Sequence, residues 1–78
     1  MINVLLFAGM KDKVGKGKIS IDVTNISVQE LKQRHLSTYN IDVQLEEALV
    51  AINEEYATDD TVINSGDTVA FIPPVSGG

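Results

Sequence analysis

The chain has 78 residues, enough for one small domain with a single hydrophobic core. Six Lys and Arg against eleven Asp and Glu give a formal net charge of −5, so a nucleic-acid partner is not expected, because an acidic chain repels phosphates. The absence of cysteine excludes a disulfide framework, a thiolate metal site and a cysteine nucleophile. No apolar run approaches the roughly 20 residues of a membrane span, and the N-terminus lacks a basic signal-peptide region. We therefore expect a cytoplasmic protein with no membrane partner.

The N-terminal residues predict a β-hairpin. Residues 2–8 form an almost unbroken apolar run that includes Ile, Val and Phe, which indicates a strand buried on both faces. Residues 9–17 contain three glycines and three lysines, and we expect them to form a flexible basic loop. Residues 18–23 alternate between apolar and polar, which is typical of a half-buried strand.

The clearest local signal is a helix start at Ser27. Ser27 and Glu30 have the spacing of a capping box, and Ile26 and Leu31 have that of a hydrophobic staple. Apolar residues continue at helical spacing as far as Tyr39, and weaker helix formers follow Leu36. The sequence therefore predicts one amphipathic helix that ends within residues 37–40.

The remaining strands are less clearly marked. Residues 45–57 are ambiguous, since 46–49 favour a helix by propensity, whereas the short apolar run that ends in Asn53-Glu54 favours a strand and a hairpin turn. We interpret 48–53 as a strand and 55–57 as a short returning strand. Residues 64–67, Asn-Ser-Gly-Asp, predict a turn. An apolar strand over 68–72 then stops at a Pro-Pro pair.

These elements predict a fold class. The order is strand, strand, helix, strand, short strand, strand, without an internal repeat or a linker. If the apolar strands 2–8 and 68–72 are neighbours, they run parallel, with the helix crossing one face. We therefore predict an α+β protein with the β-grasp fold, a mixed sheet of about five strands with one main helix packed on one face. Residues 1–72 form this domain, and 73–78 an extended C-terminal tail.

The tail is the most unusual feature of the sequence. Pro73-Pro74 is stiff and extended, so six residues in this geometry project on the order of 18–20 Å from the domain. Gly77 and Gly78 have no Cβ and pass through a channel too narrow for other residues, which leaves the α-carboxylate of Gly78 as the group delivered at the tip. The simpler alternative is a frayed terminus. That alternative does not explain a Pro-Pro stop placed directly after a buried strand.

Other polar residues give no reactive cluster. His35 is the single histidine and has no second His or Cys with which to form a metal site or a triad. Adjacent acidic pairs point apart and lack the spacing of a calcium loop. The lysines of residues 11–18 fit a solvated loop, with contact to an acidic partner as the alternative. We therefore expect no metal site.

The strands contain more apolar residues than a core on one face of the sheet can hold, and this suggests a docking patch. A single helix covers one face of a small sheet, so the residues of the other face need a different cover. The surplus set is Leu5, Phe7, Ala70 and Ile72. Apolar surface beside a projecting tail indicates docking to another protein, and the competing interpretation is cover by a loop of the same chain.

Three segments carry a family resemblance. Residues 52–56, Ile-Asn-Glu-Glu-Tyr, and 65–78, Ser-Gly-Asp-Thr-Val-Ala-Phe-Ile-Pro-Pro-Val-Ser-Gly-Gly, resemble the molybdopterin synthase small subunit family. Residues 6–15 look like the first strand and loop of that family, with Lys11 where Arg is common. The resemblance covers the whole chain, and the terminal segment is its most specific part. The family consists of ubiquitin-like sulfur carriers with the β-grasp fold.

The resemblance implies a mechanism. A ubiquitin-activating-type adenylyltransferase uses ATP and magnesium to convert the Gly78 carboxylate to an acyl-adenylate, and a sulfur donor replaces AMP to leave a thiocarboxylate. The tail then enters the active site of the large subunit and gives sulfur to precursor Z (cyclic pyranopterin monophosphate), which forms the molybdopterin dithiolene. On this basis the chain binds no cofactor and is no enzyme alone, and the catalytic side chains lie on the large subunit of a heterotetramer of two small and two large subunits.

The resemblance also implies roles for individual residues. The tail residues that thread into the partner are Pro73, Pro74, Val75, Ser76 and Gly77. Phe7 and Ile72 match positions that meet the large subunit, although the position of Ile72 is often aromatic in relatives. Three alternatives stay open: the sulfur carrier of thiamin thiazole synthesis, a ubiquitin-like tag joined to proteins through Gly78, and an interaction module with an inert tail.

Overall fold

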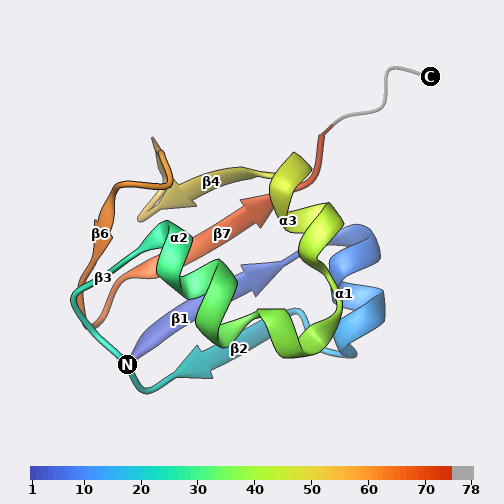
Figure 1. Cartoon of the computed structure of the whole chain (residues 1–78), viewed down its shortest axis with the longest axis horizontal. Coiled ribbons are helices and arrows are strands. Elements are labelled where there is room, and N and C mark those ends of the chain that lie inside the picture. The colour runs from blue at the N-terminus through green and yellow to red at the C-terminus, as the bar shows by residue number, and fades with distance from the viewer. Residues whose placement is uncertain (75–78) are drawn as a thin grey trace.

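The structure is a computed structural model of the chain and describes residues 1–74. Its main element is a five-stranded mixed sheet with the order β2-β1-β7-β4-β5 (Figure 1). The strands are β1 (Ile2–Leu6), β2 (Lys18–Ile21), β4 (Leu49–Ile52), β5 (Glu55–Ala57) and β7 (Thr68–Ile72). A second sheet pairs the two-residue strands β3 (Ile26–Ser27) and β6 (Val62–Ile63).

The strand pairing confirms the predicted topology. β1 and β7 are parallel neighbours, and β2, β4 and β5 join the sheet by antiparallel pairing. The predicted turn between β4 and β5 is also present, because Asn53 and Glu54 both have the positive φ values, 51° and 71°, of a mirror-image hairpin turn. The predicted turn before β7 closes with a hydrogen bond from the Asp67 N–H to the Asn64 carbonyl.

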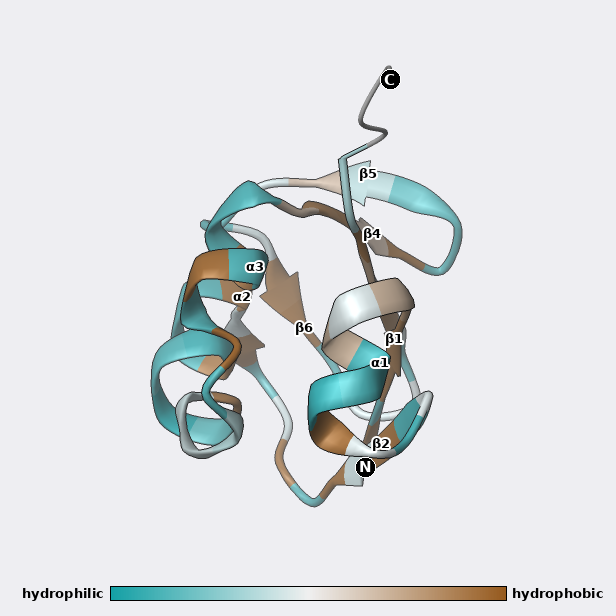
Figure 2. Cartoon of the chain, turned by 90° about the vertical axis from the view of Figure 1, so that its right-hand side faces the viewer, coloured by the Kyte–Doolittle hydropathy of each residue, from teal (hydrophilic) through white to brown (hydrophobic). Residues whose placement is uncertain are grey.

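The helical segments lie on one side of the sheet (Figures 1 and 2). The capped segment is α2 (Val28–Glu30), continued by a π-helical turn η1 (Leu31–His35) and a 3₁₀ turn η2 (Ser37–Tyr39). The Ser27 hydroxyl accepts a hydrogen bond from the Glu30 N–H at 3.1 Å, which confirms the predicted N-cap. Two further helices are α1 (Ala8–Val14) and α3 (Asp42–Glu47).

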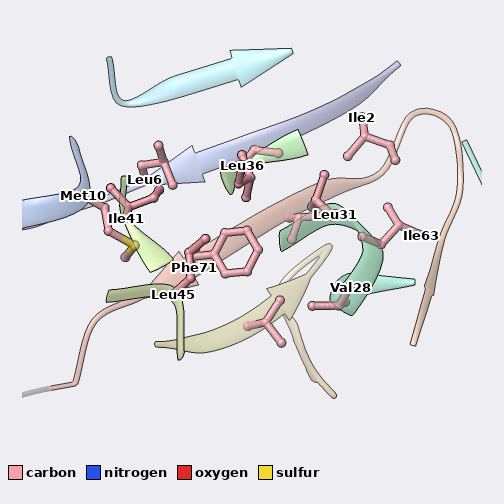
Figure 3. Close-up of a cluster of buried hydrophobic side chains, with 13 residues drawn as sticks. Ile2, Leu6, Met10, Val28, Leu31, Leu36, Ile41, Leu45, Ile63 and Phe71 are labelled. Atoms are coloured by element: carbon pink, nitrogen blue, oxygen red, sulfur yellow. The ribbon is translucent and has the colours of Figure 1, made fainter. Parts of the chain in front are cut away.

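The hydrophobic core fills the space between these helices and the sheet (Figure 3). Phe71 on the central strand is completely buried there. The other members come from every helical segment except η2 and from both sheets: Ile2, Val4, Leu6, Met10, Val28, Leu31, Leu36, Ile41, Leu45, Val50, Ile63 and Val69. Burial in β1 and β7 alternates strictly, so each strand gives one set of side chains to the core and the other set to the opposite face.

Two sequence predictions about the first 17 residues were wrong. β1 ends at Leu6 rather than residue 8, and its second face is only half-buried. Residues 9–17 are not a loop throughout, because α1 occupies Ala8–Val14 and ends at Gly15, which has a φ of 85° and donates its N–H to the Lys11 carbonyl. The reason is Met10, which is fully buried and fixes this turn against the core.

The sequence analysis missed three further elements. Helix α3 includes residues 46 and 47, so their helix propensity was real, whereas Leu49 already begins β4, which spans 49–52 rather than the predicted 48–53. Strands β3 and β6 are too short to produce an alternation pattern. The single predicted helix is thus the largest part of a helical layer with several segments.

The turn before β7 depends on the carboxylate of Asp67. It accepts hydrogen bonds from the Asn64 backbone N–H at 2.9 Å and from the Asn53 side-chain amide at 3.0 Å. These bonds, the Asn64 one foremost, hold the pKa of Asp67 below its usual value. The charged carboxylate is therefore favoured in the folded state.

A pH dependence of stability follows from this arrangement. Because the folded pKa is depressed, the contribution of Asp67 is present above the unfolded pKa, near about 4, and is lost as the pH falls through the folded value. We expect Asp67→Asn to lower the free energy of unfolding at pH 7 and to flatten the loss of stability as the pH falls below about 4. Urea unfolding across this range measures both effects. Asp60→Asn is the control, since it removes a charge from an exposed side chain. Equal slopes for Asp67→Asn and the unmodified chain contradict the prediction.

Candidate functional site

The second face of the sheet is open in the part of the chain that the structure describes, because the helices lie on the opposite side (Figure 2). The strand register places one row of side chains across the middle of this open face, as cross-strand partners. This central row runs from β2 to β5 as Lys18, Leu5, Ala70, Ala51 and Tyr56. Its middle members are alanines, so the face is hollowed between larger neighbours, and the hollow measures about 620 Å³.

A second row lies at the end of the sheet where β7 finishes. Ile72 is half-buried and pairs with Leu49, which is 55% exposed. Phe7 follows the last paired residue of β1 in extended conformation and is 44% exposed. Pro73 and Pro74 come directly after Ile72. The chain therefore leaves the sheet beside the most apolar edge of the open face.

The third row, at the opposite end, is polar. Asn3 pairs with Ser20 and Thr68, and the Ser20 hydroxyl donates to the Asn3 side-chain oxygen at 3.2 Å. The Asn53 side-chain oxygen accepts the Thr68 N–H at 3.0 Å. Lys18 and Glu54, both exposed, lie at opposite edges of the sheet, so the two edges carry opposite charges.

The structure brings the four predicted docking residues to this face. Leu5, Ala70 and Ile72 line the hollow, and Phe7 lies outside its lining. Sequence reasoning missed Leu49, Ala51 and Tyr56, which share the face; Tyr56 is 77% exposed. Their signal was present in the hairpin at Asn53-Glu54, since a two-residue turn fixes which residues of the two strands are partners.

Of the residues predicted to thread into the partner, the structure describes only Pro73 and Pro74. Pro73 is half-buried and Pro74 is exposed. Val75, Ser76, Gly77 and the reactive Gly78 lie outside the described residues. Their roles therefore stay predictions.

The described residues do not form a reactive cluster. Within residues 1–74 no three His, Cys, Asp or Glu side chains come together in a way that could hold a metal ion, and the buried residues are all apolar. No helix in this part is long and apolar enough to span a bilayer. The feature that distinguishes it is a surface, an open apolar face that ends where the tail begins.

Comparison with known proteins identifies the family. The sequence model of the ThiS family matches residues 4–78. The molybdopterin synthase sulfur carrier subunit of Dictyostelium discoideum is 42% identical over 82 residues, which cover 96% of this chain and 93% of that protein.

Solved structures show the same fold. A crystal structure of SAMP1 from Haloferax volcanii superposes with a TM-score of 0.84 at 23% identity, covering 99% of this chain and 98% of that one. The complex of subunits 1 and 2 of molybdopterin-converting factor from Helicobacter pylori contains a chain that superposes with a TM-score of 0.70 at 20% identity, covering 99% and 97%. These likenesses confirm the predicted β-grasp fold. The match along nearly the whole sequence shows that the chain belongs to the ThiS family, among the molybdopterin synthase sulfur carrier subunits.

Proposed function

We propose that this chain carries sulfur on the C-terminal carboxylate of Gly78 and gives it to precursor Z in molybdopterin synthesis. The observation that carries the proposal is the open apolar face that ends at Ile72, directly before the Pro-Pro segment. A docking surface at the base of a tail lets one binding event fix where the tail tip lies. The name of the relative from Dictyostelium discoideum supports the pathway.

The chemistry requires activation by a partner. A carboxylate is a poor acyl donor, so an adenylyltransferase with ATP and magnesium joins the Gly78 carboxylate to AMP and releases pyrophosphate. Sulfur supplied at the oxidation level of sulfide then attacks the acyl carbon, the bond from that carbon to AMP breaks, and a thiocarboxylate remains. In this proposal the catalytic side chains belong to these partners.

The large subunit is the proposed partner for the open face. The Helicobacter pylori structure is a complex of subunits 1 and 2, which supports an equivalent pair for this chain. A heterotetramer of two small and two large subunits is the assembly that we propose. Phe7, Leu5, Ala70 and Ile72 supply the apolar centre of the contact, and Leu49 and Tyr56 extend it. Exposed aromatic side chains are typical anchors of such interfaces.

Intact mass from cells separates this proposal from its alternatives. Replacement of one oxygen by sulfur at Gly78 is the expected result and identifies a sulfur carrier. Attachment to lysines of other proteins instead identifies a conjugated tag. Loss of molybdopterin rather than of thiamin in a deletion strain separates the two carrier pathways.

The position of the tail tip is the first point to test. We expect deletion of Gly78, or addition of one alanine after it, to reduce sulfur transfer by about 100-fold or more, because the reacting carbon then misses its place in the partner. Single-turnover sulfur transfer measures the effect, with thermal melts to confirm an unchanged fold. An extended, unprocessed tail with normal transfer contradicts the proposal.

The width of the tail is tested at Gly77. A β-branched side chain is wide and restricts the backbone, so we expect Gly77→Val to fold normally but to block adenylation and transfer. Gly77→Ala is the matched control, with an intermediate loss. Normal rates for the Val variant mean that the tip does not pass through a narrow channel.

The docking role of Phe7 is tested against a core neighbour. We expect Phe7→Ala to weaken binding of the large subunit by about 2–4 kcal/mol, as for aromatic interface anchors. Leu6→Ala, in which a fully buried side chain is truncated, is expected to cost roughly 2–5 kcal/mol of folding stability instead. Thermal melts and a binding titration on both variants measure the two effects. If Phe7→Ala unfolds the domain while its folded fraction binds normally, Phe7 is a core residue.

A further inference from the structure

We infer that the open face also fits a second copy of this chain, in a symmetric dimer whose two-fold axis lies parallel to the strands and passes over β7. The argument rests on the order of side chains across the sheet. β7 is the third of five strands, so this axis places β1 opposite β4 of the other copy and β2 opposite β5. Two sheets packed face to face keep their strands within about 30° of each other, which is compatible with this axis.

The central row is self-complementary in size under this symmetry. Leu5 of one copy comes to lie over Ala51 of the other, a large side chain over a small one, and Ala70 lies over its own equivalent. The hollow at the two alanines therefore receives the leucine of the opposite sheet. Interdigitation of large and small side chains is the usual way in which two sheet faces reach native packing density.

The edges of the sheet are complementary in charge. The same symmetry places Lys18 on β2 opposite Tyr56 on β5, and Glu54 in the adjoining turn lies beside that tyrosine in the lining of the hollow. The lysine then meets an aromatic ring and a carboxylate, and each such contact occurs twice in the dimer. Cation–π contacts and ion pairs of this kind favour one orientation over others.

The outer rows favour a two-fold axis parallel to the strands over one that runs across them. With the axis parallel to the strands, the apolar row of Phe7, Ile72 and Leu49 faces its own copy, and so does the polar row at the opposite end. An axis across the strands instead places Phe7 and Leu49 over polar side chains and brings Lys18 toward Lys18. The arrangement of rows therefore commits the face to one self-paired geometry.

The dimer and the complex with the large subunit exclude each other, because both cover the open face. A face of five short strands lies at the low end of specific interface sizes, so we expect a dissociation constant between about 10 µM and 1 mM. The inference does not depend on the proposed function, since it concerns the purified chain alone.

Sedimentation velocity of the purified chain from about 1 µM to 1 mM, at about 0.15 M salt, is the first test. We expect a reversible monomer–dimer equilibrium. In ¹H–¹⁵N spectra of the unmodified chain, dilution is expected to shift the amide signals of Leu5, Ala51 and Ala70 more than those of the helices. This second measurement needs no variant and therefore no assumption about folding.

A charge exchange tests the geometry. Lys18→Glu is expected to weaken the dimer about tenfold or more, because two favourable contacts become repulsive. Glu54→Lys is expected to weaken it as well, and the double variant Lys18→Glu/Glu54→Lys, which keeps the net charge of the chain, is expected to recover most of the loss. Arg34→Glu is the control, because it makes the same change of charge at an exposed residue of the helical layer.

Three results overturn the inference as a whole, and a fourth contradicts the axis that it assigns. The first is a chain that stays monomeric up to about 1 mM. The second is a dimer whose dilution shifts lie away from the open face. The third is equal weakening by Lys18→Glu and Arg34→Glu, which reduces the effect to net charge. Recovery in the double variant supports the parallel axis, and failure to recover while both single variants weaken the dimer contradicts it.

Discussion

The structure depends on the two-residue period of β7. Val69 and Phe71 are buried in the core, while Ala70 and Ile72 face the other way, so the strand that anchors the domain also forms the middle of the open face. Hydrogen bonding to β1 and β4 on both sides fixes its direction and register. The burial of Phe71 therefore determines the position from which the tail leaves, since Ile72 and the two prolines follow it directly. A one-residue slip of β7 would exchange the two sets of side chains and remove both the core and the face.

The helical layer explains why the opposite face stays apolar. All helical segments pack on one side of the sheet, and the core between them and the sheet contains residues from along the chain. The core therefore does not require large side chains at the centre of the open face. Ala51 and Ala70 lie there and leave a shallow hollow. Larger apolar side chains line the hollow at Leu5, Tyr56 and Ile72. This shape fits the docking role proposed for the open face.

Much of this could be predicted from the sequence, because strands reveal themselves by alternation and the N-cap at Ser27 by its spacing. The same alternation correctly predicted that Leu5 and Ala70 share the face opposite the core, but the predicted set for this face was incomplete. It was incomplete because Leu49 and Tyr56 join the face only through the register of β4 and β5, which is a non-local property. Helix α1 was missed because its glycines and lysines resemble a loop, and the single buried Met10 that holds it is recognisable only once the core is known.

The two uses of the open face impose an order of affinities. A carrier has to be accepted and released in turn, so no occupant of the face can bind so tightly that it blocks the next. In the proposed complex, insertion of the tail adds contacts that a second copy lacks. We therefore expect the complex with the large subunit to be the tighter of the two. A weak dimer then shields an apolar surface when the chain is abundant, and mass action returns it to the monomer as partners bind. The strength of that dimer is set by the small side chains Ala51 and Ala70, which admit a partner surface without holding it in a deep pocket.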